Sequence, residues 1–175
     1  MISDRARESL HQIFLKAARS RLGSDASESL EITQLDSHHA ANVPERDIVV
    51  LTISSLLFRL LVILHIEQSD TASEDVAGPH GNEQFYELVN LCCGAINTEL
   101  LNHFPDLGMS TPNTLHGHCA AYLDALAPAS LTRYVITVNP SLRIGAVLCW
   151  CAYAPIDFVY EPGAAEDVTD ELELF

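Results

Sequence analysis

The sequence predicts a single α+β domain, built from one mostly antiparallel β-sheet with two long amphipathic helices packed on it. Two segments place apolar residues at the three-and-four spacing of a helix, and the remaining apolar runs are short and β-branched, as is typical of strands. The chain has 175 residues, 48% of them apolar. Because a domain of this length removes roughly 70% of its chain surface from water, we expect residues 1–160 to fold around one core.

The two predicted helices cover Arg5 to Leu22 and Gly81 to Phe104. The apolar face of the first contains Leu10, Ile13, Phe14, Ala17, Ala18 and Leu22. That of the second contains Phe85, Leu88, Val89, Cys92, Ile96 and Leu100. Ser3 or Asp4 is expected to cap the first helix, and Gly23 is a plausible stop.

Six apolar runs are predicted to be strands. They cover Leu30 to Leu35, Ile48 to Ile53, Leu57 to Ile66, Asn113 to His118, Arg133 to Val138 and Leu142 to Tyr153. The second and third are separated only by a few residues around Ser54 and Ser55, which predicts an antiparallel hairpin. In the last run, even-numbered residues from Leu142 to Ala152 are apolar and are expected to share one face. Polar stretches 36–47 and 68–80 are expected to be loops.

The strongly negative net charge of the chain limits the classes of molecule that we expect it to bind. The chain has 24 acidic and nine basic side chains, a formal net charge of −15. Since nucleic acids and anionic lipids are bound by neutralising their charge with Lys and Arg, neither is an expected partner. Residues 161–175 contain six acids and no base, which predicts a solvated acidic tail. No apolar leader or membrane span is visible, so we expect a cytoplasmic protein in which the five cysteines are reduced.

The second helix has an unusual polar face. Its members are Glu83, Glu87, Asn90, Gly94 and Asn97, which lie within a stripe less than about 90° wide. Asn and Gly cost a helix up to about 1 kcal/mol each relative to Ala, so helix propensity alone does not explain their choice. Gly94 leaves the face flat, which would let another protein surface approach closely.

The segment EQFYELVNLCCGAINTELLNHFPDLGMSTPNTLHG resembles the signature of the CheC/CheX chemotaxis phosphatases. In that signature a helix bears Asp or Ser, then Glu four residues on, then Asn three residues later, with a proline about 22 residues further. Glu83 stands at the Asp/Ser position, Glu87 and Asn90 match, and Pro112 lies within one residue of the expected place. With the preceding hairpin, the likeness covers roughly residues 46–153, and the single signature is similar to the CheX branch.

The resemblance implies that the chain hydrolyses the aspartyl phosphate of a phosphorylated response-regulator receiver domain in a chemotaxis or two-component pathway. In such a reaction Glu87 would pair with the receiver's lysine, and the amide of Asn90 would orient the attacking water. Glu83, Gly94, Asn97 and Pro112 would contact the partner. The chain would need no cofactor of its own, because the Mg²⁺ belongs to the receiver, and most of the catalysis would be positioning.

Two alternatives stay open at this point: an inactive module that binds a receiver or signalling partner without hydrolysis, and self-association as a homodimer. Glu83 departs from the usual Asp or Ser. The first helix repeats the spacing with Asp4, Glu8 and His11, but a His stands in place of Asn and no proline follows at the right distance. We interpret this second copy as degenerate or accidental.

The sequence gives little support for a metal site, a nucleophilic cysteine or a nucleotide-binding loop. A zinc site would have to combine donors from two strands, namely His116, His118, Cys119, Cys149 and Cys151. The two-residue spacer usual between zinc-binding cysteines is missing, so packed thiols and surface histidines are the favoured interpretation and no metal is expected. Cys92 and Cys93 fall on the buried side of their helix, which disfavours a nucleophilic role. Nucleophile-elbow and phosphate-loop motifs are absent.

Overall fold

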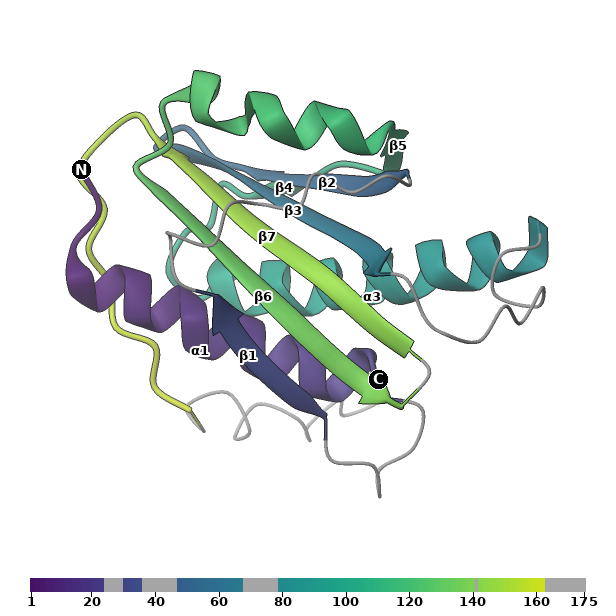
Figure 1. Ribbon diagram of the computed structural model, residues 1–175. Helices are drawn as coiled ribbons and strands as arrows, with labels where there is room; N and C mark the ends of the chain where they lie inside the picture. The colour runs from purple at the N-terminus through teal and green to yellow at the C-terminus, as the bar shows by residue number, and fades with distance from the viewer. Residues whose placement is uncertain (24–29, 36–46, 68–78, 141, 163–175) are drawn as a thin grey trace, which may run out of the picture.

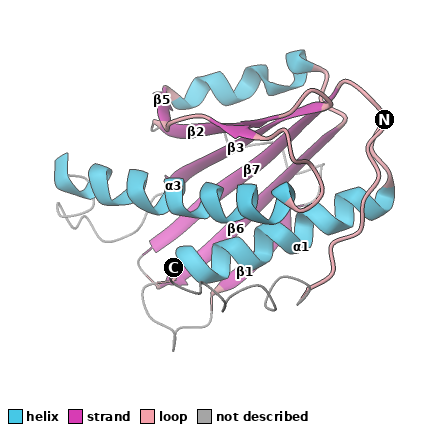
Figure 2. Cartoon of the chain, turned by 180° about the vertical axis from the view of Figure 1, so that it is seen from behind, coloured by secondary structure: helices cyan, strands magenta, loops and turns pink. Residues whose placement is uncertain are grey.

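The computed structural model describes residues 1–23, 30–35, 47–67, 79–140 and 142–162. Its helices are α1 (Asp4–Arg21), α3 (Pro79–Leu101) and the 3₁₀ helix η1 (Gly117–Leu126). Its strands are β1 (Glu31–Leu35), β2 (Ile48–Ser54), β3 (Phe58–Glu67), β4 (Gly108–Met109), β5 (Asn113–Leu115), β6 (Ser130–Asn139) and β7 (Leu142–Ala152). The α1 and α3 helices cover one face of the sheet and η1 covers part of the other (Figures 1 and 2). The predicted α+β class is therefore confirmed.

The seven-stranded sheet has the order β1-β6-β7-β3-β2-β4, with β5 also paired to β2. All of its strand pairs are antiparallel. The predicted β2–β3 hairpin is confirmed, and its turn is closed by a 2.9 Å hydrogen bond from the Ser55 amide to the Phe58 carbonyl. The long strands β3 and β7 lie at the centre, where full pairing on both sides holds them rigidly under the helices.

The main core lies between the sheet and the pair α1 and α3, which run side by side across it (Figure 2). Its largest fully buried side chains include Trp150, Tyr134, Phe14 and Phe58. Phe58 meets the Trp150 ring edge-on at 5.5 Å between centroids, a favoured aromatic geometry. Alternate residues of β7 from Ile144 to Trp150 join this core, as the sequence predicts.

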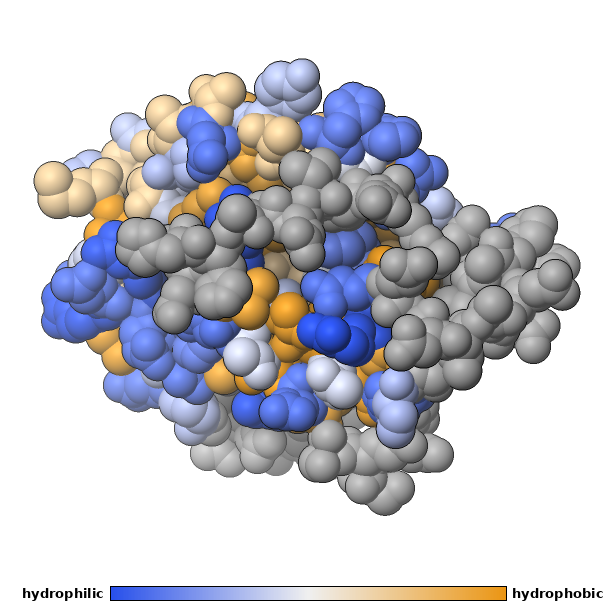
Figure 3. Space-filling view, viewed as in Figure 1, coloured by the Kyte–Doolittle hydropathy of each residue, from blue (hydrophilic) through white to orange (hydrophobic). Residues whose placement is uncertain are grey.

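On the opposite face, η1 adds a third, 3₁₀ helix to the two long helices that the sequence predicts. Leu123 of η1 packs into a smaller cluster with Ile48, Val50, Val147 and Cys149. The predicted strand over Asn113 to His118 ends at Leu115, since the chain turns into η1 at its cap, where the Nδ1 of His116 accepts from the His118 amide at 3.3 Å. Ala127 ends η1 in the left-handed conformation, with a φ of 47°. Figure 3 shows this side of the molecule as a mixture of apolar and polar surface.

Both long helices begin and end close to the predicted residues. Ser3, rather than Asp4, is the N-cap of α1, and its hydroxyl accepts from the Ala6 amide at 3.0 Å. The α3 helix begins at Pro79, two residues before the prediction, where proline suits a first helical turn. Within the described residues, no helix is long and apolar enough to cross a membrane. Most of the predicted loops 36–47 and 68–80, and most of the predicted acidic tail, lie outside the described residues.

Candidate functional site

The polar stripe predicted on the second helix lies on the outer side of α3. The side chains of Glu83 and Glu87 are exposed, and Asn90 is half-buried. The opposite side of the helix is buried in the main core through Phe85, Val89, Cys92, Cys93, Ile96 and Leu100. Because Asn90 lies three positions after Glu87 on the helix, their side chains project from neighbouring positions on the same face. A carboxylate and a carboxamide are thus presented together beside solvent on a rigid element.

Gly94 gives this face its shape. Apart from its chain neighbours and the backbone of its own helix, no heavy atom of the described residues would lie within 4 Å of a Cβ atom added to Gly94. Packing inside the chain therefore does not require a glycine here, although Ala would be about 1 kcal/mol more favourable in a helix interior. The absence of a side chain leaves a flat area one turn beyond Asn90, where the surface of a partner can approach the helix backbone.

Asn97 lies at the border of the face. The residue is half-buried, and its side-chain oxygen is covered from solvent without a hydrogen-bond partner among the described residues. A partner would therefore reach Asn97 through its amide nitrogen or after a side-chain rotation, since an asparagine has both a donor and an acceptor end.

Pro112 is held beside α3 by the short strands at the sheet edge. It lies between β4 and β5 and is half-buried. The hydroxyl of Thr114 in β5 donates to the hydroxyl of Tyr86 in α3 at 3.0 Å. On the other side of the proline, the Ser110 amide donates to the Thr52 carbonyl of β2 at 2.9 Å. The structure thus brings the proline segment and the signature helix together although 22 residues separate Asn90 from Pro112.

Two apolar residues extend the face and were not among the predicted site residues. Leu91 is 43% exposed and Leu101 is 40% exposed. Leu91 follows Glu87 by four residues and Leu101 follows Gly94 by seven, so both fall on the outer side of the helix. The helical period alone could have placed them there. We call the surface formed by Glu87, Asn90, Leu91, Gly94 and Leu101 the α3 face.

An ion pair joins the two long helices away from this face. The Lys16 ammonium of α1 lies 2.8 Å from the Glu99 carboxylate of α3. The hydrogen bond to Glu99 is the main reason that the pKa of Lys16 is raised above its ordinary value. A partly exposed pair of this kind contributes at most about 1 kcal/mol, so its main effect is to help fix the rotation of α3.

The two cysteines of α3 offer no nucleophile to the α3 face. Burial raises the pKa of Cys92 and of Cys93 to about 12, which keeps both thiols protonated near neutral pH. Both side chains face the core, as predicted. The chemistry available at this face is therefore hydrogen bonding and charge pairing by Glu87 and Asn90, which can position a reactant but cannot form a covalent intermediate through a thiolate.

The donors considered for zinc do not form a metal site. Among the described residues, no group of three or more His, Cys, Asp or Glu side chains is placed to hold an ion. The imidazoles of His116 and His118 are exposed and bonded to each other, with 2.6 Å between their Nδ1 atoms. Cys119, Cys149 and Cys151 instead join the second apolar cluster.

Comparison with solved structures identifies the fold. A CheC-like superfamily protein from Shewanella sp. PV-4 superposes with a TM-score of 0.56 at 12% identity, over 81% of this chain and 97% of that one. The chain has the CheC/CheX fold. CheX from Vibrio vulnificus matches with a TM-score of 0.53 at 13% identity, over 81% of this chain and 98% of that one. CheX from Borrelia burgdorferi, solved in complex with CheY, BeF₃ and Mg²⁺, matches with a TM-score of 0.55 at 10% identity, over 83% of this chain and 97% of that one.

The likeness to CheC and CheX proteins is one of structure. No protein-family profile matches the sequence. No curated protein matches it either. With identities of 10–13%, the packing of the helices on the sheet is shared although few side chains are.

Proposed function

We propose that the chain is a phosphatase that removes the aspartyl phosphate of a receiver domain in a chemotaxis or two-component pathway. The observation that supports this most is the placement of the exposed Glu87 and the half-buried Asn90 side by side on the outer side of α3, within a fold shared with CheC and CheX proteins. One of these similar structures is a CheX protein in complex with CheY.

In the proposed reaction, water attacks the phosphorus of the receiver's aspartyl phosphate. The bond between phosphorus and the aspartyl oxygen breaks, which releases inorganic phosphate and restores the aspartate. The amide of Asn90 would accept a hydrogen bond from the water and hold it in line with the breaking bond. A carboxamide suits this role because it both donates and accepts without titrating. The Mg²⁺ required for the reaction would belong to the receiver.

Glu87 would position the receiver rather than act on the phosphate directly. A carboxylate on an exposed helix face can pair with a lysine of the partner, and Asn90 on the next turn is then aimed at the partner's active site. Leu91, Gly94 and Leu101 would supply a flat apolar contact beside these two residues. Pro112 and the exposed Glu83 lie at the ends of this contact in the same proposal.

The α3 face also fits the alternative of a binding module without hydrolysis, since exposed leucines favour contact and not catalysis. A measurement of phosphate release distinguishes the phosphatase from the binding module. We expect a phosphorylated receiver to lose phosphate faster with the wild-type chain, by about 10²-fold or more if positioning supplies about 3 kcal/mol. Asn90→Ala should remove most of this acceleration and keep binding, whereas Glu87→Ala should weaken binding.

Asn102→Ala is the matched control, because Asn102 is also exposed but lies in the turn after α3, 12 residues beyond Asn90. It should leave the rate unchanged. If the wild type binds the receiver without accelerating release, the binding module is the correct function. A homodimer remains a separate proposal, and the mass of the chain in solution without a receiver tests it.

A further inference from the structure

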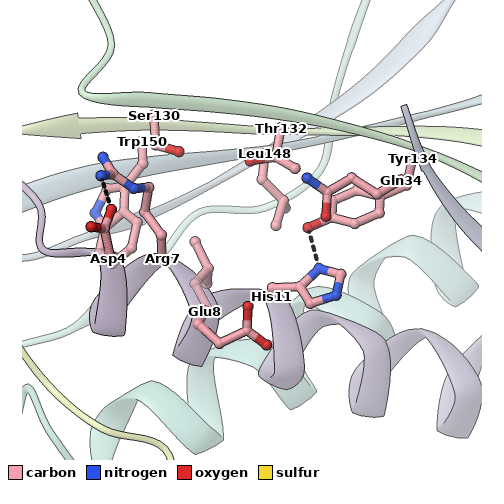
Figure 4. Close-up of a pocket in the computed structure, with 11 residues that line it drawn as sticks. Asp4, Arg7, Glu8, His11, Gln34, Ser130, Thr132, Tyr134, Leu148 and Trp150 are labelled. Carbon is pink, nitrogen blue, oxygen red and sulfur yellow. Dashed lines mark hydrogen bonds and ion pairs between the residues drawn. The ribbon is translucent and has the colours of Figure 1, made fainter. Parts of the chain in front are cut away.

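A second site lies on the other long helix, where a pocket opens between α1 and the sheet (Figure 4). Its volume is about 240 Å³, enough for about eight water molecules at ~30 Å³ each. Polar side chains of α1 form one wall, and side chains of β1, β6 and β7 form the other. The pocket is thus large enough for a small organic molecule and is lined mainly by groups that form hydrogen bonds.

Among the described residues, the Glu8 carboxylate of the lining has no cationic side chain as an ion-pair partner. Arg7 is already paired with Asp4 at one end of the pocket. Glu8 lies between this pair and His11, and it accepts a hydrogen bond from the neutral amide of Gln12 at 2.7 Å. Its negative charge acts across the pocket, since it contributes, after burial, to raising the pKa of Tyr134. With one uncompensated negative charge, the pocket favours a cation over an anion.

One residue of the pocket lining has a covered hydrogen-bond donor that lacks an acceptor among the described residues. Trp150, only 1% exposed, lines the end of the pocket beside Asp4 and Arg7. Its indole nitrogen is covered and has no hydrogen-bond partner among the described residues. A buried donor without a partner costs about 1–3 kcal/mol. At the opposite end of the pocket, His11 and Tyr134 are hydrogen-bonded to each other, with 2.9 Å between the His11 Nδ1 and the Tyr134 hydroxyl.

We infer that this pocket binds a small organic cation that combines an ammonium group with a neutral oxygen acceptor, as an amino alcohol does. The ammonium pairs with the Glu8 carboxylate. The oxygen accepts from the indole N–H of Trp150 after a small side-chain shift uncovers it. Leu148 and the Trp150 ring form the apolar wall for the carbon atoms between the two groups.

The chain provides a direct probe, because Trp150 is its only tryptophan. The indole N–H therefore gives a single cross-peak in a ¹H–¹⁵N spectrum of the full chain. Titration with ethanolamine hydrochloride should move this peak saturably. Ethylamine hydrochloride, which lacks the oxygen, should bind more weakly, and sodium chloride at equal ionic strength should leave the peak in place.

Glu8→Gln tests the charge, and we expect it to weaken ethanolamine binding about tenfold, equivalent to about 1.4 kcal/mol. Glu31→Gln is the matched control, since Glu31 is an exposed carboxylate on β1 outside the pocket. It should bind ethanolamine like the wild type. Circular dichroism checks that both variants fold.

Three results would overturn the inference. One is an indole peak that ethanolamine does not move, and another is equal affinity of Glu8→Gln and the wild type. The third is a peak that sodium acetate moves and ethanolamine does not, which would make the pocket an anion site. Equal binding of ethylamine and ethanolamine would remove the role assigned to the Trp150 N–H.

Discussion

The imidazole ring of His65 lies directly against Gly145 on the face of the sheet away from α1 and α3. His65 and Gly145 are paired across β3 and β7. A Cβ atom added to Gly145 would overlap the imidazole ring of His65. Only glycine therefore leaves room for the ring, and the two residues should act as a unit when they are mutated.

Gly145→Ala should lower the free energy of unfolding by about 1–3 kcal/mol, the usual cost of overpacking. In a His65→Ala background the same substitution should cost much less, because the overlapping ring is gone. Chemical denaturation of the wild type, the two single variants and the double variant gives the coupling energy. Additive effects of the two substitutions would contradict this account of the contact.

Acid should destabilise the protein through His65. Burial lowers the pKa of its imidazole below the ordinary 6.5, against a smaller opposite effect of Glu67, which is itself paired with Arg143 at 3.2 Å. As the pH falls below 6.5, the unfolded state takes up a proton that the folded state resists. The contribution of the neutral His65 imidazole to the free energy of unfolding is therefore complete above pH 6.5. It is lost as the pH falls toward the lowered pKa of His65.

The measurement is the free energy of unfolding between pH 7.5 and about pH 5 for the wild type and His65→Leu. The wild type should lose more stability over this range, since the other histidines are common to both chains. If the two curves are parallel, His65 is not responsible for the acid sensitivity.

At the scale of the element, the start of α1 depends on Ser3. Its hydroxyl caps the helix at the Ala6 amide and also lies 2.6 Å from the Asp157 carboxylate, which it helps to keep at a lowered pKa. Ser3→Ala should cost about 1–2 kcal/mol in thermal or chemical unfolding, as expected for a lost cap. Ser20→Ala, at the far end of the same helix, is the control and should cost little, because alanine is the better helix former.

Gly94→Ala separates stability from function on α3. The substitution should raise the free energy of unfolding by about 1 kcal/mol, because the new Cβ meets no neighbour and alanine is favoured in a helix. It should also weaken receiver binding, because the methyl group stands on the flat part of the α3 face. Denaturation and receiver titration of the same sample check both effects. A variant that is more stable and binds equally well would show that Gly94 lies outside the contact.

The sequence predicts the elements that have strong hydrophobic periods. Both long helices, the β2–β3 hairpin and the strands β6 and β7 follow from apolar residues that repeat at helical or alternating spacing. The η1 helix could not be found this way, because only Gly117 and Leu123 in its ten residues are buried. Strand β4 has two residues, too few to show any period.

The polar face of the candidate site follows from the same helical period, with the same limits, whereas the roles of its residues are those that the resemblance to the CheC/CheX signature implies. Glu87 and Asn90 could be placed on an exposed face because the buried side of α3 is strongly apolar. Whether Asn97 is open or half-covered depends on neighbours from other elements, which the sequence of one helix does not contain. The pocket under α1 likewise forms mainly against β6 and β7, which lie more than 100 residues further along the chain, so the sequence groups Glu8 only with a degenerate motif.

At the scale of the whole molecule, the net charge of −15 constrains the partner. A receiver that pairs with Glu87 through a lysine must tolerate the surrounding negative field, so we expect a basic rim on its surface. Binding should weaken as salt is raised from about 0.1 M toward 1 M, because the Debye length falls from about 10 Å to about 3 Å. Calorimetric titration of the chain with the receiver across this range of salt concentration measures the change in affinity. An affinity that rises with salt would indicate an apolar contact dominated by Leu91 and Leu101.

The phosphatase proposal is tested most directly by the time course of phosphate release from a phosphorylated receiver, with and without the full chain. The proposal predicts faster release with the wild type and a return to the receiver's own rate with Asn90→Ala, while Asn90→Ala still binds the receiver loaded with beryllofluoride. Release at the receiver's own rate in the presence of wild-type chain that is demonstrably bound to it would contradict the proposal.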